Sequence, residues 1–252
     1  MLLISYSLSD VGKKRDHNED SFFADDNLGL YIVADGVGGQ AKGEVASKEA
    51  VENLQCWIMR HKNILEEFKE TRDKNFKFQI RRMLESGIQS SCYVVYGLSK
   101  QLSPTSRMAT TMSVALFIDN TLFTGQVGDS RIYRFRAGET IQLTEDHTLL
   151  NYKLKKGLIS LKEAKTTRKG RNIITRAVGQ QDFVEVDTAS FEVQTGDRYL
   201  LCSDGLHGYI KNNEEISEII SSDLPSVPGK FIELANNRGG KDNITAVVLE
   251  LM

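Results

Sequence analysis

The fold of this chain is decided by one stretch, Tyr31-Ile32-Val33-Ala34-Asp35-Gly36-Val37-Gly38-Gly39. Its apolar run predicts a short strand over 29–35 that is buried on both faces. The glycines after it predict a turn in which the backbone can approach a ligand closely. Asp35 stands between the two. The stretch therefore predicts a buried strand that ends in an anion.

Other acidic residues repeat this pattern along the chain. Asp129, Asp204 and Asp242 each stand at the end or the start of an apolar run, and Glu19 and Asp20 precede another. Taken singly, an aspartate before glycine is most often a turn residue. Burying several anions together is costly unless positive charge lies among them. Ligand sets made only of oxygen suit magnesium, manganese or calcium, so the pattern favours a cluster of divalent cations.

Hydrophobic periodicity predicts the other elements. Amphipathic helices are expected at about 41–60 and 73–100, joined by a charged, solvated connection over 60–75. Two further helices are expected at 213–221 and 226–237. A phase slip near Thr188-Ala189 suggests a bulge in the strand 184–193. The remaining strands are expected at 2–10, 20–25, 111–118, 121–128, 131–136, 140–144, 197–203 and 243–251.

The order of these elements predicts the fold class. Short turns between neighbouring strands favour mostly antiparallel sheets, and the helix pairs can cover the outer faces of two packed sheets. We therefore expect an α+β protein, a four-layer α-β-β-α sandwich. Residues 1–252 are expected to form one domain. The basic, weakly periodic segment at about 145–182 is expected to be a flap without regular structure.

Composition narrows the function classes. Lys and Arg total 32 against 34 Asp and Glu, a net charge of −2 that argues against a general nucleic-acid binder. The three cysteines form no C-x-x-C pair and suggest free thiols in a reducing compartment. No signal peptide or membrane-spanning run is recognised. A soluble, cytoplasmic, monomeric protein without membrane contact is expected.

Nine short motifs carry a family resemblance. They occur in order along nearly the whole chain: Arg15–Asp20, Asp35–Gly39, Gly43–Ala46, Thr110–Thr111, Gly128–Arg131, Leu143–Thr148, Ile174–Gly179, Cys202–Leu206 and Asp242–Thr245. In these motifs and their order the chain resembles the metal-dependent Ser/Thr protein phosphatases of type 2C, the PPM family. The resemblance implies a catalytic domain of the bacterial kind.

The resemblance also implies a cofactor and its ligands. The cofactor would be two Mg²⁺ or Mn²⁺ ions, with Asp35 bridging both and the carbonyl of Gly36 binding one. Asp204 and Asp242 would complete the shell of the first metal. Glu19 would serve the second metal, directly or through water.

Three further residues receive roles from the same resemblance. Asp20 would support Glu19 from the second shell, and Asp129 would hold a weaker third metal. Arg15 would bind the phosphate and, with Asp35, form the catalytic pair. The planar fork of an arginine suits phosphate oxygens. A surface salt bridge from Arg15 to Asp16 or Glu19 is the alternative.

One position departs from many eukaryotic members of that family. They carry a histidine, proposed to protonate the leaving oxygen, where this chain has Val37. A metal-bound water or another side chain would then supply the proton. His147 is a candidate for that role, although structural hydrogen bonding is its commoner use. His17, His61 and His207 are interpreted as surface or local hydrogen bonders.

The resulting expectation is Mg/Mn-dependent hydrolysis of phosphoserine and phosphothreonine in proteins by a water that bridges the two metals. The enzyme would oppose a Ser/Thr kinase in a bacterial cell. A pseudophosphatase that binds phosphoproteins and a phosphatase for small phosphoesters are the alternatives. The presence of all four acidic ligands argues against the first. The basic residues Arg168, Lys169 and Arg171 are either a solvated face or a surface that steers phosphoproteins.

Overall fold

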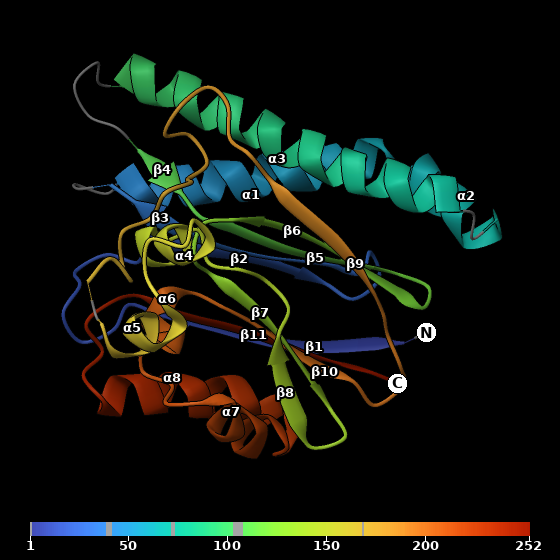
Figure 1. The fold of residues 1–252 in the computed structure, drawn as a ribbon. Helices are drawn as coiled ribbons and strands as arrows, with labels where there is room; N and C mark the ends of the chain where they lie inside the picture. The colour runs from blue at the N-terminus through green and yellow to red at the C-terminus, as the bar shows by residue number, and fades with distance from the viewer. Residues whose placement is uncertain (1, 39–41, 72–73, 103–107, 168) are drawn as a thin grey trace.

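In a computed structural model, the chain forms four layers (Figure 1). Two sheets pack against each other, and helices cover the outer face of each sheet. The structure describes residues 2–38, 42–71, 74–102, 108–167 and 169–252. The expected fold class is thereby confirmed: the chain has the α+β sandwich that its strand order and helix pairs predict. Gly39 and Arg168, both part of those expectations, lie outside the described residues.

The first sheet has five strands in the order β1-β11-β10-β7-β8. Every neighbouring pair in it is antiparallel. The first and last strands of the chain lie side by side here, and the termini are joined by hydrogen bonds between Leu2 and Met252. The strands are β1 (Leu3–Asp10), β7 (Arg131–Arg136), β8 (Glu139–Gln142), β10 (Arg198–Cys202) and β11 (Ile244–Leu251).

The second sheet follows the order β2-β3-β5-β6-β9 and is also antiparallel. The short strand β4 (Ala109–Thr110) pairs with the end of β3. Strand β9 pairs with β6 without interruption, so the bulge expected near Thr188 is wrong, and the strand begins at Asp187. The other strands are β2 (Asp20–Asp25), β3 (Leu30–Val37), β5 (Met112–Ile118), β6 (Thr121–Val127) and β9 (Asp187–Glu192).

Helices cover the outer face of each sheet (Figure 1). The six-stranded sheet is covered by α1 (Lys42–Arg60) and α3 (Lys74–Leu102), with α2 (Lys62–Thr71) packed beside them. The five-stranded sheet is covered by α7 (Asn213–Ile220) and α8 (Val227–Asn237), which follows a 3-10 turn at Leu224–Ser226. The short helix α6 (Asp204–His207) follows β10 directly.

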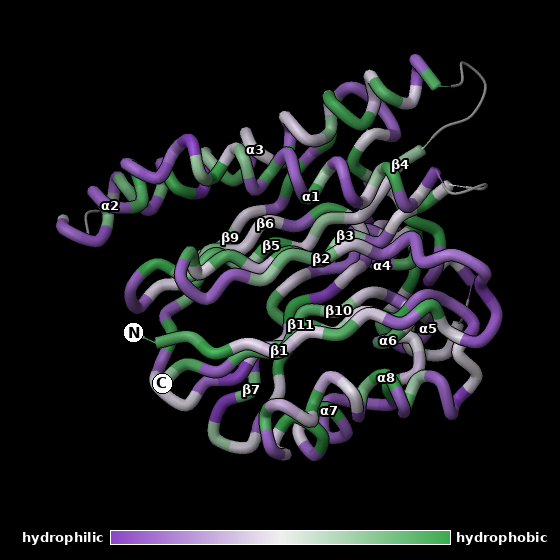
Figure 2. Tube along the Cα trace, turned by 180° about the vertical axis from the view of Figure 1, so that it is seen from behind, coloured by the Kyte–Doolittle hydropathy of each residue, from purple (hydrophilic) through white to green (hydrophobic). Residues whose placement is uncertain are grey.

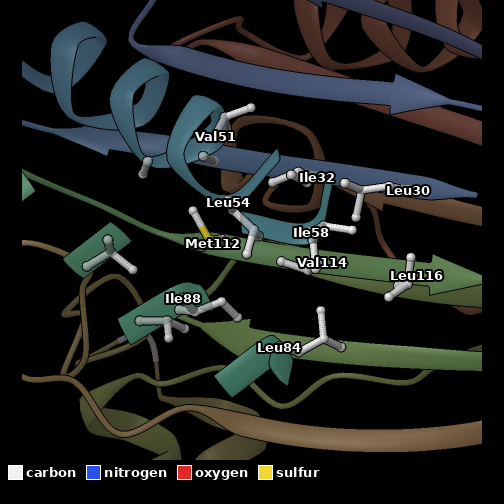
Figure 3. Packing of buried hydrophobic residues seen from close by; sticks show 14 of the residues in the cluster. Leu30, Ile32, Val51, Leu54, Ile58, Leu84, Ile88, Met112, Val114 and Leu116 are labelled. Atoms are coloured by element: carbon white, nitrogen blue, oxygen red, sulfur yellow. The ribbon is translucent and has the colours of Figure 1, made fainter. Parts of the chain in front are cut away.

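Three apolar clusters fill the spaces between the four layers. In the one shown in Figure 3, Leu54 and Ile58 of α1 and Leu84 of α3 lie against strand residues that include Val114. Tyr31 alternates with Ile32 along β3, so it packs in the layer between the two sheets. Because β3 is covered on both faces, its apolar run is continuous.

Two segments expected to lack structure are helical, and these expectations are wrong. The charged stretch 60–75 contains α2, whose Leu65 and Phe68 are buried while its charges face solvent. Figure 2 shows hydrophilic and hydrophobic positions alternating along this helix. The flap contains α4 (Leu149–Lys155) and α5 (Leu161–Thr166), which begin at the caps Thr148 and Ser160. Within the described residues, no helix is long and apolar enough to span a membrane.

Candidate active site

The ends of several strands meet at one edge of the sandwich and bring the predicted acidic residues together. In the antiparallel ladder of β2 and β3, Asp20 pairs directly with Asp35. Asp204 begins the helix after β10, and Asp242 lies two residues before β11. Since β10 and β11 are neighbours in the other sheet, both sheets contribute carboxylates to the same edge.

The backbone of Asp35 is fixed by the two threonines beside it. Its N–H donates to Thr111 Oγ1 at 2.9 Å, and its carbonyl accepts from the Thr110 hydroxyl at 2.9 Å and the Thr111 N–H at 2.8 Å. Both threonines are fully buried. The Thr110–Thr111 motif therefore has a physical role that its sequence alone did not reveal.

These residues line an open cavity of about 560 Å³. Val37 and the flap residues Asn172 and Ile174 also line it, and Val37 has no proton to donate. Asn172 was missed in the sequence, because an asparagine in a weakly periodic segment gives no signal. The predicted site residues in the wall of this cavity are Arg15, Glu19, Asp35, Gly36, Asp204 and Asp242.

Asp129 belongs to a neighbouring cavity of about 340 Å³ beneath the flap helices. Asp204 lines both cavities, so the two spaces meet at that carboxylate. Asp146 also lines the smaller cavity, but Arg131 donates to both of its carboxylate oxygens, at 2.9 and 2.6 Å. Asp129, by contrast, has a buried Oδ1 without a hydrogen-bond partner among the described residues.

The electrostatics of the site are those of crowded anions. Burial, followed by repulsion from Asp20, Asp204 and Asp129, raises the pKa of Asp35 well above its ordinary value. Burial is also the main cause that raises the pKa of Asp20 to about 7 and that of Asp129 to about 7. The pKa values of Asp204 and Glu19 are raised by burial as well. Such a group favours the binding of positive charge.

The residues fit divalent cations in donor chemistry. Among the described residues, Oδ1 of Asp20 and Oδ1 of Asp129 are buried without a hydrogen-bond partner. All side-chain donors proposed are oxygens, which hard cations prefer. As the side chains lie, no three His, Cys, Asp or Glu groups in the described part of the chain are already arranged to hold a metal ion. Closing a ligand shell therefore requires side-chain adjustment, and Asp242 is turned toward Arg15.

Gly36 lies where no side chain fits. A Cβ there would stand 2.2 Å from the carbonyl oxygen of Gly43 and 2.5 Å from that of Glu19. The Gly36 N–H donates to the Glu19 carbonyl at 3.0 Å, and the Gly43 N–H donates to Glu19 Oε1 at 3.2 Å. The start of α1 thus holds Glu19 next to the end of β3.

Arg15 lies in the cavity wall and contacts an acid there. Its Nη2 lies 3.0 Å from Asp242 Oδ2 and 2.9 Å from Oδ1, so the surface pairing considered with Asp16 or Glu19 is wrong. The two side chains are 48% and 38% exposed, which leaves the guanidinium reachable from solvent. A hydrogen bond from Arg15 to Asp242 is the first cause of its raised pKa.

Two supporting residues were quoted in motifs without a role. Asn243 is buried, and its side chain donates to the carbonyls of Val11 and His17 and accepts from the Glu19 N–H. Thr245 donates to Asp20 Oδ2 at 2.6 Å, and Ser203 donates to the same oxygen at 2.7 Å.

His147, His207 and the flap residue Arg171 have hydrogen-bond partners outside the larger cavity. His147 bonds to Gly128 and Asp187 and not to the larger cavity, which supports structural hydrogen bonding over the acid role considered for it. His207 bonds to the Asp129 carbonyl. Arg171 donates to the carbonyl of Ala164, so it is part of the flap's own structure.

The comparisons with known proteins agree with this site. A family model described as Protein phosphatase 2C matches residues 12–231. Protein phosphatase PhpP of Streptococcus pneumoniae is 34% identical over 250 residues, 97% of this chain and 96% of the relative. Serine/threonine phosphatase stp of Listeria monocytogenes serotype 4b is 37% identical over 247 residues, 96% of this chain and 93% of the relative.

Solved structures extend the likeness to the whole fold. The Mycobacterium tuberculosis serine/threonine phosphatase PstP/Ppp superposes with a TM-score of 0.84 at 32% identity, covering 100% of this chain and 99% of the other. A PstP catalytic domain in complex with two manganese ions gives a TM-score of 0.78 at 31% identity, over 99% and 98% of the chains. The chain belongs to the protein phosphatase 2C family, and the fold and the metal-dependent phosphatase activity predicted from its sequence are confirmed.

Proposed function

We propose that this phosphatase acts on phosphoserine and phosphothreonine in proteins and uses two Mg²⁺ or Mn²⁺ ions held by Glu19, Asp35, Asp204 and Asp242, together with the Gly36 carbonyl. The observation that carries the proposal is the shared cavity of about 560 Å³ that these residues line. The relatives named as serine/threonine phosphatases support the choice of substrate.

When bound, the cations supply positive charge that offsets the phosphate dianion and acidifies the attacking water. The residues of this chain do the rest. Arg15, already in the cavity wall, binds phosphate oxygens and balances charge that grows in the transition state. For this it exchanges its contact with Asp242 for one with the substrate, which its exposure permits.

The backbone network keeps the carboxylates in place during this exchange. Thr110 and Thr111 hold Asp35, and Ser203 and Thr245 hold Asp20 beside it. Since these bonds are made by the backbone and by buried hydroxyls, they persist whether or not Arg15 is bound to phosphate. A weaker third cation at Asp129 is part of the same proposal and is supported by the free Oδ1 of that residue.

We further propose that the enzyme opposes a Ser/Thr kinase in the cytoplasm of a bacterial cell and acts as a monomer. The bacterial relatives support the setting. A phosphoproteome comparison with and without this chain tests the kinase relationship. Accumulation of phosphothreonine and phosphoserine sites in its absence is expected, and an unaltered phosphoproteome would contradict it.

The test of the activity is release of phosphate from matched pSer, pThr and pTyr peptides with Mn²⁺ or EDTA. Turnover of pSer and pThr should require Mn²⁺ and exceed that of pTyr. Asp35→Asn should remove most turnover, whereas Asp26→Asn, at the other end of the β2–β3 pair, should not. Full turnover in EDTA would refute the metal mechanism. Metal-dependent turnover of pTyr or small esters alone would refute the substrate class.

A further inference from the structure

Asp129 stands on a short loop between β6 and β7 and depends on that loop for its position. Gly128 before it has a φ of +97°, a conformation that favours glycine. Asp129 is buried, and its Oδ1 has no hydrogen-bond partner in the part of the chain that the structure describes. Two imidazoles contact the backbone of this loop, one at Gly128 and one at Asp129.

The first imidazole belongs to His147, at the start of the flap. The Gly128 N–H donates to His147 Nδ1 at 3.2 Å, and the backbone N–H of His147 donates to the Gly128 carbonyl at 2.9 Å. Because Nδ1 accepts, the neutral ring carries its proton on Nε2. Nε2 then donates to Asp187 Oδ2 at 3.0 Å, and Arg176 binds the other oxygen of that carboxylate at 2.7 Å.

The second imidazole belongs to His207, the last residue of α6. Its Nε2 donates to the Asp129 carbonyl at 2.9 Å. Helix α6 begins with Asp204, which lines both cavities. The His207 contact therefore ties the backbone of Asp129 to the helix that carries another proposed ligand, one residue along the chain from the His147 contact.

We propose that His147 and His207 are positioning residues that fix the Gly128–Asp129 backbone, one from the start of the flap and one from α6, and so hold the Asp129 carboxylate ready to bind the weaker cation. The inference rests on the proposed function of Asp129. Both contacts go to the backbone, so they constrain the loop without occupying the carboxylate. Outer groups of this kind set the orientation of a ligand and with it the metal affinity.

Paired substitutions separate positioning from general packing. When asparagine replaces histidine, its amide group lies near the position of imidazole Nδ1. When glutamine replaces histidine, its amide group lies near the position of Nε2. His147→Asn keeps an acceptor for the Gly128 N–H, whereas His147→Gln does not. His207→Gln keeps a donor to the Asp129 carbonyl, whereas His207→Asn does not. Each position thus has its own matched control, and the conservative residue differs between the two.

The measurements are amide hydrogen exchange at Gly128 in chelator and Mn²⁺ binding by titration calorimetry, with Mn²⁺-dependent turnover beside them. His147→Gln should speed Gly128 exchange roughly fivefold, the loss of one net hydrogen bond. His147→Gln and His207→Asn should each weaken Mn²⁺ binding at the weaker site roughly tenfold. His147→Asn and His207→Gln should weaken it clearly less.

The outcomes are distinguishable from a failure of the proposed function. If Asp129→Ala binds Mn²⁺ as the wild type does, Asp129 is not a ligand and the inference for metal binding falls with it. The exchange rate of Gly128 still decides whether His147 holds the loop. Equal behaviour of the Asn and Gln variants at both positions, in exchange and in binding, would overturn the positioning roles.

Discussion

Replacing Asn243 by alanine tests how the loop that carries Arg15 is held. Asn243 is 4% exposed, and its side chain bonds to three backbone groups of the loop 11–19. Its Nδ2 donates to the carbonyls of Val11 and His17 at 3.0 and 2.9 Å, and its Oδ1 accepts from the Glu19 N–H at 2.8 Å. The variant removes all three bonds and leaves their backbone partners without them.

The size of the effect follows from these contacts. Three net hydrogen bonds contribute about 3 kcal/mol. The loop 11–19 is partly exposed, so water can replace part of what is lost. We therefore expect a loss of about 2 kcal/mol in the free energy of unfolding. Asn236→Ala is the matched control, because its side chain donates one bond, to Asp10 at 3.0 Å, and its Oδ1 accepts none from the described residues. It should cost about 1 kcal/mol or less.

The assay is urea unfolding in EDTA, followed by the fluorescence of Trp57, the only tryptophan. Chelation separates folding from metal binding, which would add its own stabilisation. In parallel, the KM for a phosphopeptide should rise for Asn243→Ala, because the loop that presents Arg15 is loosened. A loss no larger than that of Asn236→Ala would refute the reasoning from the three bonds.

Further changes test the crowded site and the sandwich. Asp35→Asn should unfold in EDTA at no lower urea concentration than the wild type, because it relieves repulsion among buried anions; marked destabilisation would contradict this. Gly36→Ala should lose activity and roughly 1–3 kcal/mol of stability, since its Cβ would meet a carbonyl oxygen at 2.2 Å, whereas Gly229→Ala, with open space, should be tolerated. Burial raises the pKa of Asp197, but hydrogen bonds led by Arg136 outweigh it and lower that pKa. The stability this gives above about pH 4 is lost as pH falls through the folded-state pKa, so Asp197→Asn should flatten the acid dependence of the urea midpoint; an unchanged slope would contradict the pairing.

Prediction from sequence worked where local pattern and burial agree. The apolar run before Asp35 is continuous because β3 is covered on both faces, and the sequence therefore showed the strand. The predicted end at Asp35, with a turn at the glycines after it, is wrong, because pairing with β4 continues β3 to Val37. It failed where tertiary contacts overrule weak patterns. Helix α2 buries only Leu65 and Phe68, too few to show a clear stripe among its charges. In the flap, α4 has seven residues and α5 has six, too few turns for a helical period to show in the sequence.

The sequence by itself determined the family, the layered fold and the acidic residues at strand ends, because motif order and hydrophobic period are local properties of the chain. Only the tertiary structure decided which partners those residues have. It paired Asp20 with Asp35 across a ladder and turned Arg15 toward Asp242. It also placed His207 against the Asp129 carbonyl. Such contacts join residues far apart in the chain, and no spacing within a sequence encodes the distance between two atoms brought together by packing.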